Sequence, residues 1–511
     1  MYPFDHIRQV LERGEAARPA IAAPGRPPLT HGGLRDLAAR TVAALNRLGI
    51  GRGDRVGIVL PNGPEAAASF IAIASGATTA PLNPAYRREE FEFYVSDLHA
   101  KALVIPRGMD SPARAVAAAL GIPILELIAA ENGAAGEFAL TPERDPGGAA
   151  AAAKPGFAAA DDIALVLHTS GTTSRPKIVP LSHRNITATA HHIGTTLRLT
   201  PDDVCLNIMP LFHIHGLMAA VLSSVAAGAS VFCTPGFNAF RFFAWFAEAN
   251  PTWYTAVPTM HQAILSLAAR NEATIKAGRL RLIRSSSSSL PPQVFAALEE
   301  TFGAPVIESY GMTEASHQMA SNPLPPAPRF PGSVGIAAGP EIAIMDAEGT
   351  LLAPGQTGEV VIRGRNVTAC YENNPDANAR AFTNGWFRTG DEGVLDDAGY
   401  LRLSGRLKEI INRGGEKVSP LEVDVVLMDH PAVQQVVTFA MPHDKLGEEV
   451  AAAVVLREGT SCGEHELRDF CAERLATFKV PRKILFLAEI PKGATGKLQR
   501  IGLAARLGLS G

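Results

Sequence analysis

The segment from Ile163 to Pro180, Ile-Ala-Leu-Val-Leu-His-Thr-Ser-Gly-Thr-Thr-Ser-Arg-Pro-Lys-Ile-Val-Pro, decides how the rest of the chain is interpreted. Its opening apolar run predicts a buried strand. Six small residues follow, five of them with hydroxyl groups, and Lys177 comes soon after. Such residues let backbone N–H groups approach an anion, and a lysine adds a mobile positive charge. An ordinary Ser/Thr-rich surface loop is the alternative. The flanking strand and the lysine favour a loop that grips a polyphosphate, formed by Thr169, Ser170, Gly171, Thr172 and Thr173.

The chain of 511 residues is too long for one compact core, so two or more domains are expected. Its composition is globular, and a net charge of −3 argues against binding to nucleic acid or to anionic membranes. The five scattered cysteines fit a reducing cytoplasm, and the N-terminus has no signal-peptide core. Serines and a glycine interrupt the apolar stretch from Gly216 to Phe232, which predicts a buried helix followed by a strand rather than a membrane span.

Helical and strand-like patterns alternate from residue 5 to about residue 400, which predicts an α/β fold with parallel strands. The turn expected in this region covers residues 80–84. Residues 341–346 and 358–363 alternate like antiparallel strands, and an Asp- and Gly-containing turn at 396–399 predicts a hairpin. The expected helices are 34–48 and 65–76, and the expected strands are 55–60, 204–209, 230–233, 253–257, 280–284 and 306–308.

The character of the sequence changes around residues 404–406. Beyond this point the pattern predicts helices at 421–428 and 464–475 and strands at 433–440 and 451–456, which is enough for a small α+β domain. We therefore predict an N-terminal domain of residues 1–405 and a C-terminal domain of residues 406–511.

Two stretches of the N-terminal domain contain residue types suited to nucleotide chemistry. In Glu308-Ser-Tyr-Gly-Met-Thr-Glu314, Tyr310 suits a purine, Thr313 a phosphate and Glu314 a Mg²⁺ ion. A strand that runs into a capped helix is the alternative for this stretch. In Trp386-Phe-Arg-Thr-Gly-Asp391, the carboxylate suits the hydroxyl groups of a ribose, although a plain turn also fits.

Two further stretches lie at and beyond the domain boundary. The segment from Gly405 to Lys417 is dense in charge and glycine, and either a solvated linker or a hinge fits it. The segment from Pro491 to Leu498 puts Lys497 on a glycine turn near the end of the chain. That position suits the delivery of one cation into a distant site, and a solvated basic turn is the alternative.

These five motifs, in this order, resemble the adenylate-forming superfamily of acyl-CoA synthetases, luciferases and peptide-synthetase adenylation domains over nearly the whole chain. The resemblance implies a large multi-sheet N-terminal domain, a small mobile C-terminal domain and an active site between them. It also implies the use of ATP, Mg²⁺ and coenzyme A.

The resemblance assigns roles to the matching positions. Residues Thr169 to Thr173 and Lys177 would hold the ATP phosphates, Thr313 would contact the α-phosphate and Glu314 would bind Mg²⁺. The other implied roles are an adenine border at Ser287, Ser288, Ser289, Glu308, Ser309 and Tyr310, a ribose site at Asp391 and Arg406, a hinge at Lys408, a pantetheine passage at Gly414 and Gly415, and an adenylation lysine at Lys497.

Two positions depart from the family pattern. Ile178 stands where a glycine usually follows the Pro-Lys pair, and Ser174 replaces a frequent glycine. If residue 178 needs a positive φ, isoleucine is costly there, which leaves the shape of the loop open.

A narrower resemblance is to the oxalate–CoA ligases of plants and fungi. The segments that carry it are Pro210–Gly216, Trp253–Thr259, Arg284–Ser289 and Met312–Pro323. Oxalate is a small dianion, so its pocket needs donors and positive charge rather than an apolar tunnel. Core histidines, and serines that serve ATP alone, are the alternatives. A metal pair at residues 213 and 215 is not expected, because no acidic partner is evident nearby. The predicted acid pocket is His213, Ser287, Ser289 and His317, with Arg284 as a further donor.

The predicted activity is that of an ATP-dependent acid–CoA ligase, with oxalate as the acid. It forms an acyl-adenylate and then a thioester, and it releases pyrophosphate and AMP. A CoA ligase for a fatty, aryl or other small acid is one alternative. A nucleotide- or RNA-binding protein without the chemistry is another, and the presence of Lys497, Glu314 and Asp391 argues against it, as does the lack of a basic, aromatic-rich patch. The sequence predicts no oligomeric state.

Overall fold

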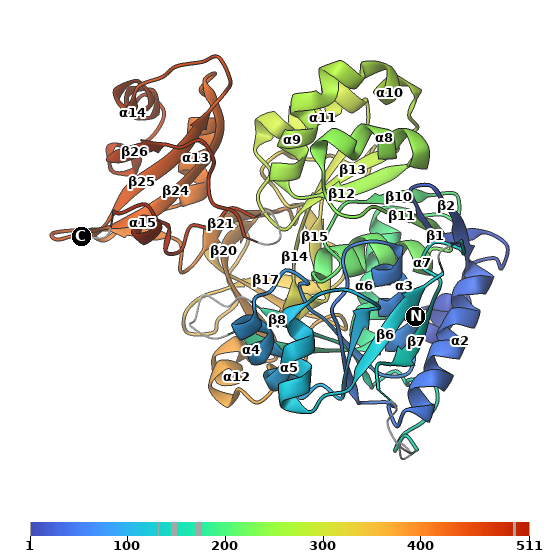
Figure 1. Cartoon of the computed structure of the whole chain (residues 1–511). Helices are drawn as coiled ribbons and strands as arrows, with labels where there is room; N and C mark the ends of the chain where they lie inside the picture. Colours follow the sequence, from blue (N-terminus) through green and yellow to red (C-terminus); the bar gives the residue numbers. More distant parts are fainter. Residues whose placement is uncertain (1, 131, 145–150, 170–175, 494–496, 510–511) are drawn as a thin grey trace.

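The computed structural model describes residues 2–130, 132–144, 151–169, 176–493 and 497–509 of the chain. These residues form four β-sheets, three in a large N-terminal domain and one in a small C-terminal domain (Figure 1). The predicted α/β fold with a large multi-sheet domain followed by a small domain is confirmed.

The first sheet is built from alternating strands and helices near the N-terminus, as the sequence pattern predicts. Its strands are β3 (Arg55–Ile58), β4 (Thr78–Pro81), β5 (Ala102–Pro106), β6 (Ile124–Ala129), β7 (Phe138–Pro142), β8 (Ile163–Thr169) and β9 (Lys177–Ser182). They lie in the order β7-β6-β5-β3-β4-β8-β9. The inner pairs are parallel and the two edge pairs are antiparallel.

The turn predicted at residues 80–84 is wrong in its first half. Ala80 and Pro81 belong to β4 and lie in register with Gly57 and Ile58 of β3. Proline is uncommon inside sheets because it lacks an N–H donor, but it is tolerated at the end of a strand, where pairing stops.

The second sheet has nine strands and forms the centre of the N-terminal domain. Its strands are β1 (Pro19–Ala23), β2 (Arg26–Thr30), β10 (Val204–Asn207), β11 (Ser230–Cys233), β12 (Trp253–Ala256), β13 (Leu282–Ser286), β14 (Val306–Met312), β15 (His317–Ser321) and β16 (Ile336–Ala337). Their order is β16-β15-β14-β13-β12-β10-β11-β1-β2, parallel from β14 to β1. All five strands predicted between residues 204 and 308 are present, although β14 continues to Met312.

Two helices lie between these sheets and contact strands of both, namely α3 (Pro64–Ala74) and α6 (His183–Thr196). The π-helix η1 (His215–Leu222) packs beside them, and α7 (Ser223–Ala226) continues it. All residues of η1 and all but Glu65 of α3 are buried, which explains why these sequences are apolar on every side. The predicted buried helix before β11 is therefore confirmed. Its π-helical hydrogen bonding has no signal in the sequence pattern.

Further helices cover the outer faces of the two sheets (Figure 1). On the seven-stranded sheet these are α4 (Arg88–Leu98) and α5 (Pro112–Leu120), and on the nine-stranded sheet they are α8 (Ala239–Ala249), α9 (Pro258–Ala268) and α11 (Pro292–Phe302). The other helices of this domain are α1 (Ile7–Leu11), α2 (His31–Arg47), η2 (Ala269–Asn271), α10 (Glu272–Ala277), η3 (Thr313–Ala315) and α12 (Pro375–Ala381).

The third sheet is antiparallel, as predicted. Its strands are β17 (Glu341–Met345), β18 (Thr357–Arg363), β19 (Phe382–Thr383), β20 (Trp386–Leu395) and β21 (Leu401–Arg406). The predicted hairpin joins β20 to β21, and its turn is closed by a hydrogen bond of 3.0 Å from the Gly399 N–H to the Asp396 carbonyl.

The C-terminal domain has its own sheet and its own core. Its strands are β22 (Ile411–Arg413), β23 (Glu416–Val418), β24 (Val433–His443), β25 (Gly447–Leu456) and β26 (Lys483–Phe486), and its helices are α13 (Pro420–Met428), α14 (Glu464–Ala472), η4 (Thr477–Lys479) and α15 (Leu503–Arg506). The two helices and two strands predicted here are all present, with ends shifted by a few residues. Of the helices in the described ranges, none combines the length and the apolar character needed to cross a membrane.

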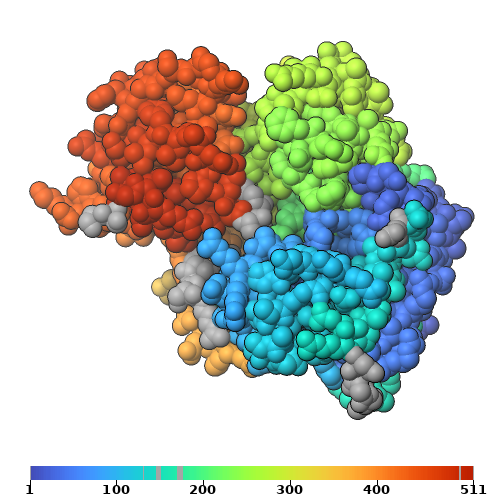
Figure 2. All heavy atoms as spheres, viewed as in Figure 1, coloured from blue at the N-terminus to red at the C-terminus, as the bar shows by residue number. Residues whose placement is uncertain are grey.

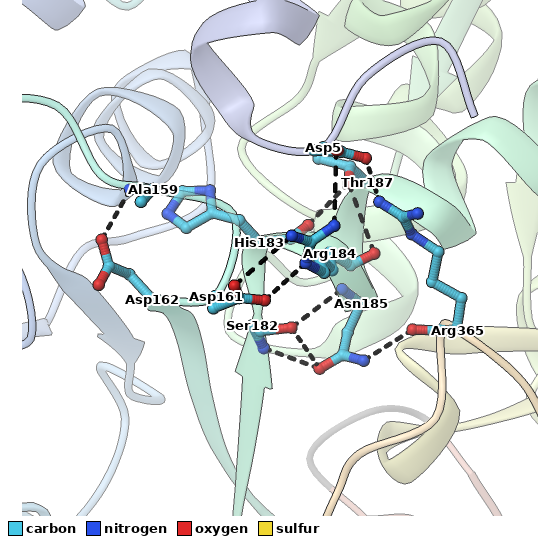
Figure 3. A network of polar contacts seen from close by, with 10 residues as sticks. All are labelled: Asp5, Ala159, Asp161, Asp162, Ser182, His183, Arg184, Asn185, Thr187 and Arg365. Atoms are coloured by element: carbon cyan, nitrogen blue, oxygen red, sulfur yellow. Dashed lines mark hydrogen bonds and ion pairs between the residues drawn. The ribbon is translucent and has the colours of Figure 1, made fainter. Parts of the chain in front are cut away.

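A polar network fixes the start of α6 (Figure 3). Ser182 Oγ accepts from the Asn185 N–H, and the Asn185 side chain accepts from the Ser182 N–H in return. Asn185 Nδ2 also donates to the carbonyl of Arg365 over 2.8 Å. Arg184 and Arg365 both pair with Asp5 near the N-terminus. These contacts anchor the end of β9, the strand that begins at Lys177.

The C-terminal domain lies beside the helices of the nine-stranded sheet (Figure 2). The side chain of Gln262 donates to the carbonyl of Gln434 over 3.4 Å, and the side chain of Gln293 donates to Asp429. Two parts of the chain far apart in sequence thus meet across the domain boundary.

The structure answers the question that Ile178 raises. Ile178 lies within β9, paired with His168 of β8, so its backbone is extended and needs no positive φ. Its side chain is buried in a hydrophobic cluster that also contains Val166, Val59 and Leu82. Isoleucine is therefore well suited to this strand position.

We expect Ile178→Ala to destabilise the protein by roughly 2–5 kcal/mol, because it removes a buried side chain from a packed cluster. The midpoint of urea unfolding measures this loss. Ile336→Ala is the matched control, since Ile336 is 36% exposed on β16 and its truncation should cost less than about 1 kcal/mol. Equal losses in both variants would contradict the packing described for Ile178.

Candidate active site

The motifs from the N-terminal domain meet at the carboxyl ends of parallel strands, where ligand sites of α/β proteins lie. The strands β10, β12, β13 and β14 end side by side in the nine-stranded sheet. The residues that follow or end these strands are His213, His215, Thr255, Ser287, Ser288, Ser289, Tyr310, Thr313 and Glu314.

Asp391 connects this group to the third sheet. The Tyr310 hydroxyl donates to one oxygen of its carboxylate, and Arg406 Nε lies 3.2 Å from the other. Burial raises the pKa of Asp391, and the charge of Arg406 opposes that rise. In turn, Asp391 raises the pKa of Arg406. The two residues predicted for a ribose therefore form an ion pair that also holds Tyr310, whose ring is almost fully buried.

Glu314 and Lys177 meet through an aromatic ring that the sequence did not single out. The Tyr371 hydroxyl donates to Glu314 Oε1 over 2.7 Å, and Lys177 Nζ lies 3.9 Å from the centre of the Tyr371 ring. Burial lowers the pKa of Lys177, while Glu314 raises it. Thr169 pairs with Lys177 across β8 and β9, and its buried hydroxyl has no hydrogen-bond partner among the described residues. The predicted phosphate residues Ser170, Gly171, Thr172 and Thr173 lie outside the described residues.

Lys497 reaches this region from the C-terminal domain. Burial lowers its pKa to about 8, and the charge of Arg406 adds to that effect while Asp391 opposes it. The charge of Lys497 also lowers the pKa of His213, which burial brings to about 3. Lys497 therefore lies within electrostatic range of His213 and Asp391 of the N-terminal domain and of Arg406 at the domain boundary.

Glu308 has a different environment from its predicted neighbours at adenine. Its side chain is 1% exposed, and its carboxyl Oε1 accepts from the Leu290 N–H over 3.1 Å. Burial raises its pKa to about 8. Glu308 therefore fixes, through Leu290, the end of the serine segment, residues 285–289, from its buried side. Ser309 is also buried and donates to the Ser285 carbonyl, whereas Ser288 and Ser289 are exposed.

A buried polar cluster lies behind the serine segment. His215 Nδ1 is 2.9 Å from Ser287 Oγ, and His215 Nε2 is 2.6 Å from Thr255 Oγ1. Arg284 Nη1 is 3.2 Å from His317 Nε2, and the rings of His215 and His317 lie 4.9 Å apart between centres, tilted by 33°. The structure thus brings the predicted residues Ser287 and His317 together through partners that sequence reasoning did not assign to the pocket, His215 and Thr255. The sequence did hold one signal for them, because His215 and Thr255 lie in the segments Pro210–Gly216 and Trp253–Thr259 that resemble oxalate–CoA ligases.

The predicted hinge and CoA residues lie in the boundary segment from Gly405 to Lys417. Lys408 is exposed between β21 and β22. Gly414 and Gly415 form the turn between β22 and β23, both with positive φ, and the Gly414 N–H donates to the Leu446 carbonyl.

Comparison with known proteins defines the family. Residues 8–372 match the AMP-binding enzyme family, and residues 422–497 match the AMP-binding enzyme C-terminal domain. The chain therefore belongs to the AMP-binding enzyme family, and its predicted place among the adenylate-forming enzymes is confirmed. It is 46% identical to the oxalate–CoA ligase of Arabidopsis thaliana over 94% of each chain. It is 43% identical to the oxalate–CoA ligase of Saccharomyces cerevisiae over 88% of this chain and 86% of that one.

Among solved structures, ATP-bound MatB from Rhodopseudomonas palustris is similar with a TM-score of 0.86 and 29% identity, over 97% of both chains. The apo structure of that protein gives a TM-score of 0.77 at the same identity and coverage. The structure is thus more similar to the ATP-bound form of that protein than to its apo form.

We expect Glu308→Gln to reduce the loss of stability with rising pH. The unfolded chain releases this proton near its ordinary pKa, whereas the folded chain keeps it until about pH 8. The folded state therefore binds more protons in between, and its stability falls as pH rises from about 5 to 8. Over this interval the variant should gain at least about 1 kcal/mol relative to the unchanged protein, measured by urea unfolding at both ends. Glu300→Gln, at an exposed position of α11, should show no such gain.

Proposed function

We propose that this protein is an AMP-forming acid–CoA ligase that acts on oxalate. The observation that carries the choice of acid is the buried cluster of Arg284, His215 and His317, which supplies donors and positive charge where a fatty or aryl acid would need an apolar channel. The similarity to two oxalate–CoA ligases supports the same choice.

In the first half-reaction, one oxygen of the acid attacks the α-phosphorus of ATP, the bond to pyrophosphate breaks, and an acyl-adenylate forms. Both reactants are anions, so catalysis depends on alignment and on charge stabilisation. We assign the ATP phosphates to Thr169 to Thr173, Lys177 and Thr313, the ribose to Asp391 and Arg406, and the adenine to the surroundings of Ser288 and Tyr310. Lys497 stabilises the charge that develops at the α-phosphate.

A Mg²⁺ ion fits the residues at Glu314. Its carboxylate is almost buried next to Lys177 and Tyr371, and one carboxylate together with phosphate oxygens is a ligand set that Mg²⁺ prefers. Bound there, Mg²⁺ would neutralise phosphate charge. Glu314 would hold it with one oxygen, since Tyr371 donates to the other.

In the second half-reaction, the thiolate of CoA attacks the acyl carbon and AMP leaves. We propose that the C-terminal domain, residues 406–511, turns about Lys408 between the two steps and so withdraws Lys497. Gly414 and Gly415, whose positive φ values favour glycine, would then border the pantetheine arm. We also propose a cytoplasmic location, which suits the five free cysteines, and no role in binding nucleic acid.

The choice of acid is tested by measuring pyrophosphate release with ATP, CoA and a panel of acids that includes oxalate, malonate, acetate, benzoate and octanoate. We expect oxalate to give the highest kcat/KM. Turnover of benzoate or octanoate without turnover of oxalate would reject the proposed acid and leave the ligase activity in place. The absence of AMP formation with every acid would reject the enzyme itself.

We expect Lys497→Ala to abolish formation of the acyl-adenylate and to leave the reaction of a supplied acyl-adenylate with CoA largely unchanged, because only the first step needs the cation. The two half-reactions are measured separately by pyrophosphate exchange and by thioester formation. Lys492→Ala is the control, since Lys492 forms a β-bridge with Leu498, the neighbour of Lys497, and pairs with Glu489 at the surface. Equal loss of both half-reactions in Lys497→Ala would contradict this role.

The pH dependence of the first step should follow the same lysine. Because the pKa of Lys497 is about 8, its amine is protonated and positively charged below that pH and loses the proton and the charge above it. We therefore expect kcat/KM for ATP in pyrophosphate exchange to fall as pH rises through about 8. In Lys497→Arg, whose guanidinium stays charged throughout this range, the fall should be absent, and a fall with the same midpoint there would show that another group is responsible.

A further inference from the structure

Arg284 is a buried cation without a counter-charge. It has no solvent exposure, and among the described residues no carboxylate pairs with it. Its guanidinium instead faces three neutral acceptors, His317 Nε2 at 3.2 Å, Gln318 Oε1 at 3.3 Å and Thr255 Oγ1 at 3.5 Å. In the same described part of the chain, its Nε–H has no acceptor. A charge buried in this way is costly, so its position needs an explanation beyond packing.

The contact with Arg284 determines which nitrogen of His317 carries the proton. Burial lowers the pKa of Arg284 only to about 9, so the guanidinium stays charged at neutral pH. Burial and the charge of Arg284 lower the pKa of His317 well below its usual range, so its ring is neutral. A neutral imidazole has one N–H and one lone pair. Because a guanidinium N–H faces Nε2, the lone pair is on Nε2 and the proton is on Nδ1.

A second branch runs from Arg284 through Thr255 to His215. The pKa of His215 is also far below its usual range because the ring is buried, so this histidine is neutral as well. With Thr255 Oγ1 facing the guanidinium, the acceptor that the described residues offer to its own proton is His215 Nε2, 2.6 Å away. His215 then carries its proton on Nδ1 and donates to Ser287 Oγ. The proton of Ser287 is left to point away from His215, toward the open side of the serine segment.

We propose that Arg284 is a positioning residue that orders the protons of His317, His215 and Ser287, so that the acid pocket presents hydrogen-bond donors and no acceptors. Its charge does not touch the acid but acts through the two histidines. The proposal rests on the proposed function of this site in binding a small acid. It gives a physical reason for selectivity toward a dianion, because every group that faces the second carboxylate donates.

The backbone holds these donors in place. Ser287 and His317 both have positive φ, 75° and 108°, which is uncommon for residues with a side chain and is typical of positions that the surroundings constrain. Gly311 allows the close approach of His317, since a Cβ there would lie 1.8 Å from the His317 carbonyl oxygen and 2.8 Å from Nδ1. The donors are therefore fixed before the acid binds, which is what favourable electrostatic binding requires.

The first test is kinetic. In Arg284→Met, which keeps the length of the side chain but removes the charge, we expect the ratio of kcat/KM for oxalate to that for glyoxylate to fall on the order of a hundredfold. Arg281→Met is the matched control, because Arg281 precedes the same strand and pairs with Asp203 instead. Its ratio should stay within about twofold of the unchanged enzyme. An unchanged ratio in Arg284→Met would overturn the proposal.

The second test reads the protons directly. Imidazole ¹⁵N signals of the histidine-labelled protein distinguish a protonated nitrogen from one with a lone pair, and a His317→Gln variant identifies the signals of that ring. We expect Nδ1–H with a bare Nε2 for His317, and a shift toward the other tautomer in Arg284→Met. A protonated Nε2 in the unchanged protein would overturn the proposal whatever the kinetics.

If Arg284→Met does not fold, Thr255→Val tests the branch to His215 with a side chain of the same shape. Thr255→Val should lower the ratio of kcat/KM for oxalate to that for glyoxylate. An unchanged ratio would count against the proposed connection from Arg284 through Thr255 to His215. The tests separate this proposal from the choice of acid. Failure of the unchanged enzyme to use oxalate would reject oxalate, whereas the ¹⁵N signals would still decide whether Arg284 orders the protons.

Discussion

The arrangement of the site depends on the carboxylate of Asp391. It accepts a hydrogen bond from Tyr310 of the nine-stranded sheet and pairs with Arg406 at the end of the third sheet, so two sheets and the approach to the domain boundary meet at one buried charge. Removing the carboxylate would leave the buried Tyr310 hydroxyl without its acceptor, which costs more than the hydrogen bond contributes. The same group thus positions the strand that leads into the C-terminal domain.

The site carries more positive than negative charge around this carboxylate. The pKa values of Lys177 and Lys497 are both lowered by burial, and the charge of Arg406 lowers each of them further. Neighbouring positive charges disfavour each other's charged form, and the negative charge of a polyphosphate favours it. ATP should therefore favour this grouping of cations, and the greater similarity of the structure to ATP-bound than to apo MatB is consistent with that reasoning.

The sequence predicted those parts of the fold and site that local patterns determine. Buried strands such as 230–233, the β20–β21 hairpin and the order of the motifs all follow from short-range signals. Ala80 and Pro81 were mispredicted because pairing with β3 overrides the local tendency of proline to form turns. The partners Tyr371 and Thr255 were not found, because one isolated side chain gives no signal of a contact with a distant residue. Burial of Glu308 likewise depends on the fold around it, and motif spacing does not encode that.

In the proposed acid pocket, neutral histidines are better suited than charged ones. Protonated rings at 215 and 317 would place two like charges 4.9 Å apart, next to Arg284 and within range of Lys497. Burial and these neighbours keep both rings neutral, so each contributes a dipole and not a charge. The direction of the dipole of a neutral imidazole depends on which of its two nitrogens carries the proton. A single buried guanidinium that stays charged at neutral pH can fix both, because it is the one group in the cluster that donates and never accepts. The proposed acid pocket therefore presents hydrogen-bond donors because of the charge of Arg284, which lies behind the two histidines and does not contact the acid itself.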